Sequence, residues 1–233
     1  MPARSALYLL FRDELLGYAR SKVMLVLWFL MPAIAIVGYL ALPSSITARS
    51  GGGFSISATM VMSALTSSLS GTIVAVMIAV DIVSERNRKV FDLFVIRPVR
   101  RDSILWSKFF AASACVVVAC LISLAAGLTV DLLRGATPSG GILRDLGKGF
   151  VQLAGVLAIS AGGGVFFGVL SRGSIVAAVI LVIQLVGFFQ YLPLLPGVLG
   201  VLPDQFWLWM LASFAIAALL VHGAAVMFRR AEL

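Results

Sequence analysis

The sequence predicts an all-α integral membrane protein with six transmembrane helices, an N-terminal interfacial helix and a charged amphipathic helix between spans 2 and 3. Of its 233 residues, 61% are apolar and only 12% are charged, with a mean hydropathy of +1.08. That is more apolar side chain than a soluble domain of this length can bury. The apolar residues also form runs of about twenty, the length that a helix needs to cross a bilayer. The predicted spans belong to a single transmembrane domain (1–233) and cover residues 23–42, 59–80, 109–130, 149–170, 174–192 and 206–228.

Residues 4–22 precede the first span and are too charged to cross a bilayer. Their apolar side chains recur every three or four residues, at Leu7, Leu10, Phe11, Leu15 and Tyr18. This pattern predicts an amphipathic helix that lies in the membrane interface. A secretory signal peptide would have an apolar core where the acidic pair Asp13 and Glu14 stands, so we do not interpret the segment as one.

The first two spans differ in their polar content. Pro32 lies inside the first span and predicts a kink. The second span carries hydroxyl groups along one face, including Ser63, Thr66, Ser67 and Ser70. This stripe either lines a substrate path or packs against a neighbouring helix, and hydroxyl-mediated packing is common in membranes.

A charged stretch, residues 81–108, interrupts the apolar sequence between spans 2 and 3. It holds seven of the eighteen Lys and Arg residues and four of the ten carboxylates, so it must face water, and its basic excess favours the cytoplasmic side. Residues 84–95 contain no Gly or Pro, and Ser84 is a candidate N-cap. Apolar side chains recur at helical spacing, at Val90, Phe91, Phe94 and Val95. We predict a short amphipathic helix that ends before Pro98.

The later spans contain small and amide side chains. Gly164 and Gly168 form a GxxxG pair in span 4, which indicates either a seam between two copies, or a moving interface, or close packing within the chain. Gln184 lies near the middle of span 5, where an amide must either bond to another helix or line a wet path. Residues 193–205 are apolar but rich in Pro and Gly, so we expect a re-entrant segment on the outer side.

The distribution of basic residues predicts the orientation. With six spans and both termini cytoplasmic, fourteen Lys and Arg residues lie inside and four lie outside, as the positive-inside rule requires. The formal net charge of +8 could indicate nucleic-acid binding. Because the basic residues gather at the ends of apolar runs, we expect lipid rather than nucleic acid as the partner.

The residues needed for several common chemistries are absent from the sequence. No GxxxxGK motif followed by Ser or Thr is present to bind ATP, and no HExxH motif to bind zinc. His222, the only histidine, lies in span 6 and is more typical of packing than of catalysis. Cys115 and Cys120 share one apolar run without metal-ligand spacing. We expect no metal, no catalytic residues and no cofactor bound by this chain.

The order of elements and the charged stretch resemble the permease subunits of type-2 ATP-binding-cassette (ABC-2) transporters, usually exporters. The cytoplasmic signature of that family matches Glu85, Arg86, Asp92, Leu93, Pro98, Arg100 and Lys108. Two positions differ, because Asn87 stands where a second Glu is usual and Lys89-Val90 replaces Gly-Thr.

The resemblance implies that the predicted amphipathic helix is a coupling helix, which seats in a cleft of a separate ATPase subunit. The residue types suit that role, because apolar side chains can anchor in a groove and charged ones can make directed contacts. The expected coupling residues are Glu85, Arg86, Val90, Phe91, Asp92, Phe94, Pro98 and Arg100. The structural alternative is a solvated basic loop that only enforces topology.

The resemblance also implies a complex of two permeases, alike or paralogous, with two ATPase subunits that bind ATP and magnesium. The expected location is the cell membrane of a prokaryote. Spans 1, 2 and 5 would face the path, so that Ser63, Thr66, Ser67, Ser70 and Gln184 would line it. Apolar walls with hydroxyls and few charges favour a hydrophobic or amphipathic cargo such as a drug, antibiotic, lipid or modified peptide.

Two other function classes remain open. A self-contained channel or secondary transporter would work without an ATPase, and it usually shows intramembrane charge or an internal repeat. An intramembrane enzyme would need a catalytic constellation, and His222 alone does not form one.

Overall fold

The computed structural model describes residues 3–41, 58–88, 101–133, 140–171, 173–194 and 206–230, and these residues contain no β-strand. The all-α prediction is confirmed. The six longest helices are α1 (Ala3–Ala19), α2 (Lys22–Ala41), α3 (Ala58–Asn87), α5 (Arg101–Leu133), α6 (Gly140–Leu170) and α10 (Phe206–Arg230). Shorter pieces connect the last two of these: α7 (Ile175–Leu181), the π-helical turn η2 (Val182–Val186), α8 (Gly187–Phe189) and the 3₁₀ turn η3 (Leu192–Leu194).

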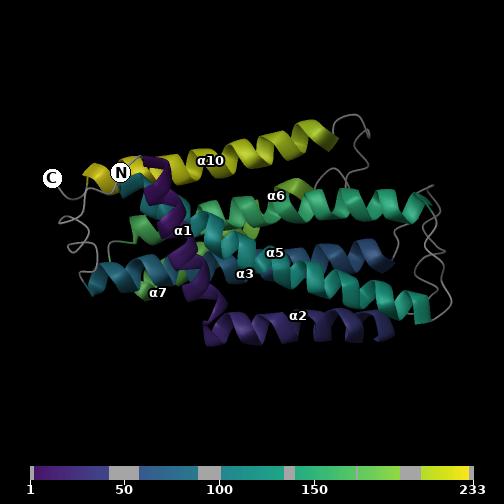
Figure 1. Cartoon of the computed structure of the whole chain (residues 1–233). Helices are drawn as coiled ribbons and strands as arrows, with labels where there is room; N and C mark the ends of the chain where they lie inside the picture. Colours follow the sequence, from purple (N-terminus) through teal and green to yellow (C-terminus); the bar gives the residue numbers. More distant parts are fainter. Residues whose placement is uncertain are drawn as a thin grey trace.

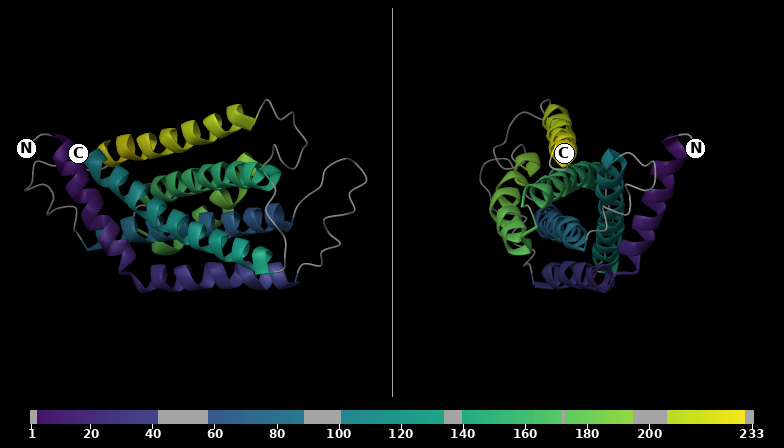
Figure 2. Two further views of the ribbon diagram at one scale, coloured as in Figure 1. Left: turned by 45° about the vertical axis from the view of Figure 1, so that its right-hand side comes forward. Right: turned by 90° about the vertical axis from the view of Figure 1, so that its left-hand side faces the viewer.

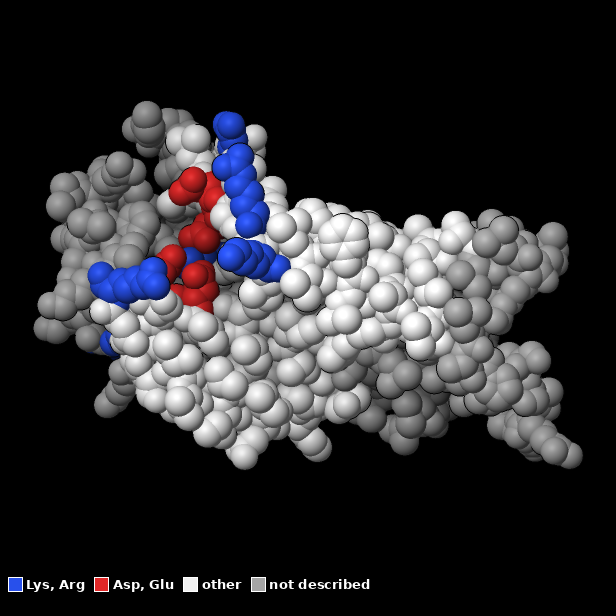
Figure 3. Space-filling view, turned by 90° about the horizontal axis from the view of Figure 1, so that it is seen from below, with Lys and Arg blue, Asp and Glu red and all other residues white. Residues whose placement is uncertain are grey.

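The long helices form an elongated bundle in which α6 lies between α3 and α10 (Figure 1). Helix α1 bends away from α2 by 65° and packs across the first part of α5 (Figure 2). The end of α3, the beginning of α5 and the ends of α6 and α10 lie at the same end of the bundle as α1. We call this the charged end, because the charged side chains on the face seen in Figure 3 gather there.

Three described helices are long and apolar enough to cross a membrane: Asp102–Ala126, Gly147–Leu170 and Phe206–Arg230. The bent pair Tyr8–Ala19 and Lys22–Ile34 could form a fourth span, and Ile175–Phe189 is apolar but shorter. The predicted membrane protein therefore has three or four candidate spans among the described residues. The count of six stays a prediction.

The charged stretch 81–108 is more helical than the sequence predicted. Helix α3 continues through Ser84 to Asn87, so Ser84 is not the N-cap of a separate helix. Helix α5 begins at Arg101, and the last two turns of the predicted stretch thus belong to it. The charged side chains of residues 81–87 do not end α3, because they find partners on other helices. No Gly or Pro interrupts this range either. Residues 89–100, with the rest of the predicted amphipathic helix, lie outside the described residues.

Two further bounds differ from the prediction. Helix α6 begins at Gly140, nine residues before the predicted start of span 4 at residue 149. The predicted fifth span begins with Ser174 as N-cap, whose side chain accepts a hydrogen bond from the Ala177 backbone N at 3.3 Å, but its helix changes to a π-helical turn at Val182. Of the predicted re-entrant segment 193–205, residues 195–205 lie outside the described residues.

Helices α3 and α6 approach so closely that their backbones touch. A Cβ atom built on Gly164 would lie 2.5 Å from the backbone oxygen of Ala75, and one on Gly168 would lie 3.0 Å from the Cα of Ala79. Small side chains spaced four apart on both helices allow this approach. The GxxxG pair therefore serves packing within the chain, and its two glycines do not face a second copy.

Candidate functional site

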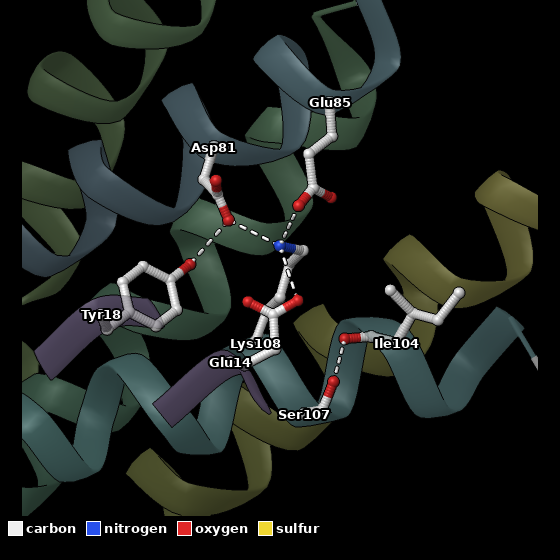
Figure 4. A network of polar contacts seen from close by, with 7 residues as sticks. All are labelled: Glu14, Tyr18, Asp81, Glu85, Ile104, Ser107 and Lys108. Atoms are coloured by element: carbon white, nitrogen blue, oxygen red, sulfur yellow. Dashed lines mark hydrogen bonds and ion pairs between the residues drawn. The ribbon is translucent and has the colours of Figure 1, made fainter. Parts of the chain in front are cut away.

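Lys108 lies at the charged end, in the third turn of α5, and its side chain has no exposed surface. Its Nζ lies 2.6 Å from Asp81 Oδ2, 2.7 Å from Glu85 Oε1 and 2.9 Å from Glu14 Oε1 (Figure 4). An ammonium group has three N–H donors. Three carboxylates thus satisfy all the donors of a fully buried lysine, which is how a charge of this kind is tolerated away from water.

The sequence brings these groups together through helical spacing. Asp81 and Glu85 are four residues apart and share a face of α3, and Glu14 and Tyr18 share a face of α1 in the same way. The Tyr18 hydroxyl donates to Asp81 Oδ2 at 2.8 Å. The Lys108 cluster, defined as these five residues, therefore joins α1, α3 and α5 (Figure 4).

The Lys108 cluster contains more negative than positive groups. Three carboxylates face one ammonium, and Glu85 Oε2 is buried with no hydrogen-bond partner among the described residues. Burial raises the pKa of the Glu85 carboxyl above its ordinary 4.5, and the nearby Lys108 only partly opposes this shift. The ionised form of Glu85 is thus less favoured than that of a carboxylate at a protein surface.

The raised pKa of Glu85 predicts a pH-dependent stability difference between the wild type and Glu85→Gln. Below pH 4.5 the carboxyl is protonated in both the folded and the unfolded chain. As the pH rises through the higher pKa of Glu85 in the folded state, the folded chain must ionise this partly buried carboxyl. The contribution of Glu85 to the free energy of unfolding is then lost. We expect the melting temperature of the wild type, measured by tryptophan fluorescence in detergent, to fall relative to that of Glu85→Gln as the pH increases from 4.5.

The control for this measurement is Thr129→Val, because Thr129 is exposed on α5, 21 positions after Lys108, and neither side chain titrates. The difference in melting temperature between this variant and the wild type should change little over the same pH range. If the melting temperature of the wild type instead rose relative to that of Glu85→Gln with increasing pH, the assigned direction of the Glu85 pKa shift would be contradicted.

Two polar side chains on the opposite face of α3 contact the last turn of α6 and the turn that follows it. Arg86 Nη1 donates to the backbone oxygen of Val169 at 3.4 Å, and Asn87 Nδ2 donates to that of Gly173 at 2.9 Å. Elsewhere at the charged end, Arg229 Nε donates to Asp102 Oδ1 at 2.8 Å, and a second contact makes this pair bidentate. Asp102 is in the first turn of α5 and Arg229 in the last turn of α10, where each charge also complements its helix dipole.

The structure describes two of the predicted coupling residues. Glu85 points into the Lys108 cluster, and Arg86 reaches the carbonyl of Val169. Their contact with an ATPase stays a prediction. The other predicted coupling residues lie outside the described residues: Val90, Phe91, Asp92, Phe94, Pro98 and Arg100.

Four members of the Lys108 cluster were missed as site residues: Glu14, Tyr18, Asp81 and Lys108. The positions of Asp81 and Lys108 at the two ends of the charged stretch predict contact with water, whereas the carboxylate is paired and the lysine is buried. The available signal was the repeated spacing of four between polar residues on 14–18 and 81–85. Which two helices would pair could not be read from that spacing.

The predicted path residues have different environments. Thr66 and Ser70 are buried, whereas the side chains of Ser63 and Ser67 lie outside the described residues. Gln184 is exposed on η2. The buried amide of this part of the chain is Gln190, only 3% exposed, whose Oε1 accepts from the Thr72 hydroxyl at 3.2 Å.

No group of three or more His, Cys, Asp or Glu side chains within the described ranges is arranged to hold a metal ion. Cys115 and Cys120 are buried free thiols, and His222 is exposed on α10. The Lys108 cluster and the Arg86 contact thus join α3 to α1, α5 and α6.

Comparison with known protein families identifies a match over most of the chain. A family model described as "ABC-2 family transporter protein" matches residues 10–191. This range begins at residue 10 within α1, includes the whole Lys108 cluster and ends after α8. No curated protein matches the chain significantly.

Proposed function

The chain belongs to the ABC-2 family of transporter proteins, and from this premise we propose that it is the permease subunit of an exporter driven by a separate ATPase. Two ATPase subunits would bind ATP and magnesium, and two permeases, alike or paralogous, would enclose the path. The proposed topology has six spans with both termini in the cytoplasm of a prokaryotic cell. The fourteen inner and four outer basic residues support this orientation.

One observation carries the proposal beyond family membership: the family's signature residues bond to other helices at the charged end. Lys108 is bound by α1 and α3, and Arg86 binds the end of α6. A displacement of the residues that follow α3 would therefore reach α1, α5 and α6 together. Coupling to an ATPase requires such a connection, because an ATPase bound at one end must move helices that cross the bilayer.

The proposed cargo is hydrophobic or amphipathic: a drug, antibiotic, lipid or modified peptide. Its support is the small number of charged side chains in the apolar spans. A polar or highly charged cargo would require buried ionic partners along the path.

A pulldown of the tagged chain in gentle detergent tests the proposal, with co-purifying proteins identified and ATP hydrolysis assayed. We expect an ATPase subunit to co-purify with the wild type. Replacing both Phe91 and Phe94 with Asp should reduce its recovery by more than about tenfold, because buried aromatic anchors dominate the energy of such interfaces.

The matched control replaces the same two phenylalanines with Leu, which keeps apolar anchors and should retain the ATPase. A chain that purifies without any ATPase and moves solute alone in liposomes would contradict the proposal. That result would favour a self-contained channel.

A further inference from the structure

The last turns of α3 present two faces to different parts of the protein. Asp81 and Glu85 face the Lys108 cluster, as described above. The other face carries Ala75, Ala79 and Val83, which share a buried apolar cluster with Ala178, Val182 and Val186 of α7 and η2. The α3 helix therefore packs directly on the helix that begins after the α6–α7 turn.

The α6–α7 turn is fixed to the end of α3 by a side chain. Gly173 has a φ of +102°, a conformation that side-chain-bearing residues rarely adopt. Its carbonyl accepts the hydrogen bond from Asn87 Nδ2 at 2.9 Å, and a Cβ built on it would lie 3.0 Å from Asn87 Oδ1. Ser174, the next residue, is the N-cap of α7. Asn87 thus holds the backbone one residue before the N-cap of α7.

Helix α7 continues into η2 without a break. Val182 and Val186 point inward, and a Cβ built on Gly163 of α6 would lie 2.6 Å from Val186 Cγ2. The three residues between these valines, including Ile183, are exposed. A π-helical turn inserts one extra residue into a helix and is frequent at functional sites. The outer face of η2 is therefore connected to the charged end through one short helix.

We propose that Asn87 is a positioning residue for transport: it ties the start of α7 to the end of α3, so that a displacement produced by the ATPase reaches η2. This inference rests on the proposed function, since it requires an ATPase bound near the residues that follow α3. The Lys108 cluster connects α3 to α1 and α5 on the other face. A displacement of the end of α3 would thus reach α7 through Asn87, and α1 and α5 through the Lys108 cluster.

The experiment uses the permease–ATPase complex in lipid nanodiscs, with Cys115→Ala, Cys120→Ala and Ile183→Cys in the permease. Ile183 is 54% exposed, and both native thiols are buried. The measured quantity is the rate of N-ethylmaleimide labelling, without nucleotide and with the ATPase trapped by ATP and vanadate. We expect the two rates to differ by about fivefold, which is typical of coupling between two sites.

In the Asn87→Asp variant, this nucleotide-dependent difference should be lost while ATP hydrolysis continues. The carboxylate has the size of the amide but cannot donate to the Gly173 carbonyl. Asn87→Gln keeps the donor and should retain part of the difference. Thr129→Val is the control, because it removes an exposed hydrogen bond that stays within α5, from Thr129 Oγ1 to the Ala126 oxygen.

A purely structural role for Asn87 would lower the melting temperature and change labelling equally in both nucleotide states. That outcome would overturn the inference. Two other results would also overturn it: an Asn87→Asp complex that keeps the nucleotide-dependent difference in labelling rate, or a complex with native Asn87 that shows no such difference. Failure to recover any ATPase contradicts the proposed function instead. The pulldown is therefore done first.

Discussion

Replacing Lys108 with methionine is expected to lower the free energy of unfolding by about 3–5 kcal/mol, the usual cost of removing one partner from a buried ion pair. Methionine fills most of the space but supplies no charge. Glu14, Asp81 and Glu85 would then face one another without a cation, and their repulsion would separate α1 from α3. Thermal unfolding in detergent, followed by tryptophan fluorescence, measures the loss.

The matched control is Lys22→Met, because Lys22 is exposed at the start of α2 and its replacement should change stability little. If Lys108→Met fails to fold, its combination with Glu14→Gln and Glu85→Gln gives the decisive comparison. Removing two of the three carboxylates should restore part of the lost stability. Equal melting temperatures for Lys108→Met and Lys22→Met would show that the cluster contributes no net stability.

Replacing Gly164 with alanine is expected to destabilise the protein by about 1–3 kcal/mol, as overpacking of a close-packed interior does. The new Cβ would lie 2.5 Å from the backbone oxygen of Ala75 and 2.8 Å from its Cα. Backbone atoms cannot rotate out of the way, so α3 and α6 would have to separate. The same fluorescence measurement reports the effect.

The chain supplies a matched control for this substitution on the same helix. A Cβ on Gly147 would meet nothing within 4 Å, so Gly147→Ala should be neutral or stabilise by up to about 1 kcal/mol through reduced backbone entropy. Adding Ala75→Gly to Gly164→Ala should not rescue stability, because the clash involves backbone atoms of residue 75. A full rescue would mean that side-chain volume, and not backbone approach, limits this interface.

The parts of the fold that the sequence predicted well are those that depend on local pattern. Apolar runs predicted helices because an isolated backbone in lipid must satisfy its own hydrogen bonds, and the candidate spans in α5, α6 and α10 overlap three predicted spans. The amphipathic spacing in 4–22 predicted a helix, and α1 covers Ala3–Ala19. Its position in the membrane interface stays a prediction.

The errors arose where a residue's partner lies far away in the sequence. Composition predicted a charged stretch between spans 2 and 3, but it cannot reveal that Lys108 pairs with Glu14, 94 positions earlier. Partners of this kind allow α3 to continue to Asn87 and α5 to begin at Arg101, inside the predicted charged stretch. Similarly, Gln184 and Gln190 are both amides in one apolar segment, and only packing distinguishes the exposed side chain from the buried one.

The Lys108 cluster also constrains the order in which the chain can assemble during synthesis. Glu14 and Tyr18 leave the ribosome first, Asp81 and Glu85 follow, and the lysine that neutralises them is made last. Until residue 108 emerges, the nascent chain holds three acidic groups with no reason to approach one another. The docking of α1 is therefore a late event, which must await the first turns of α5 even though α1 is translated well before them.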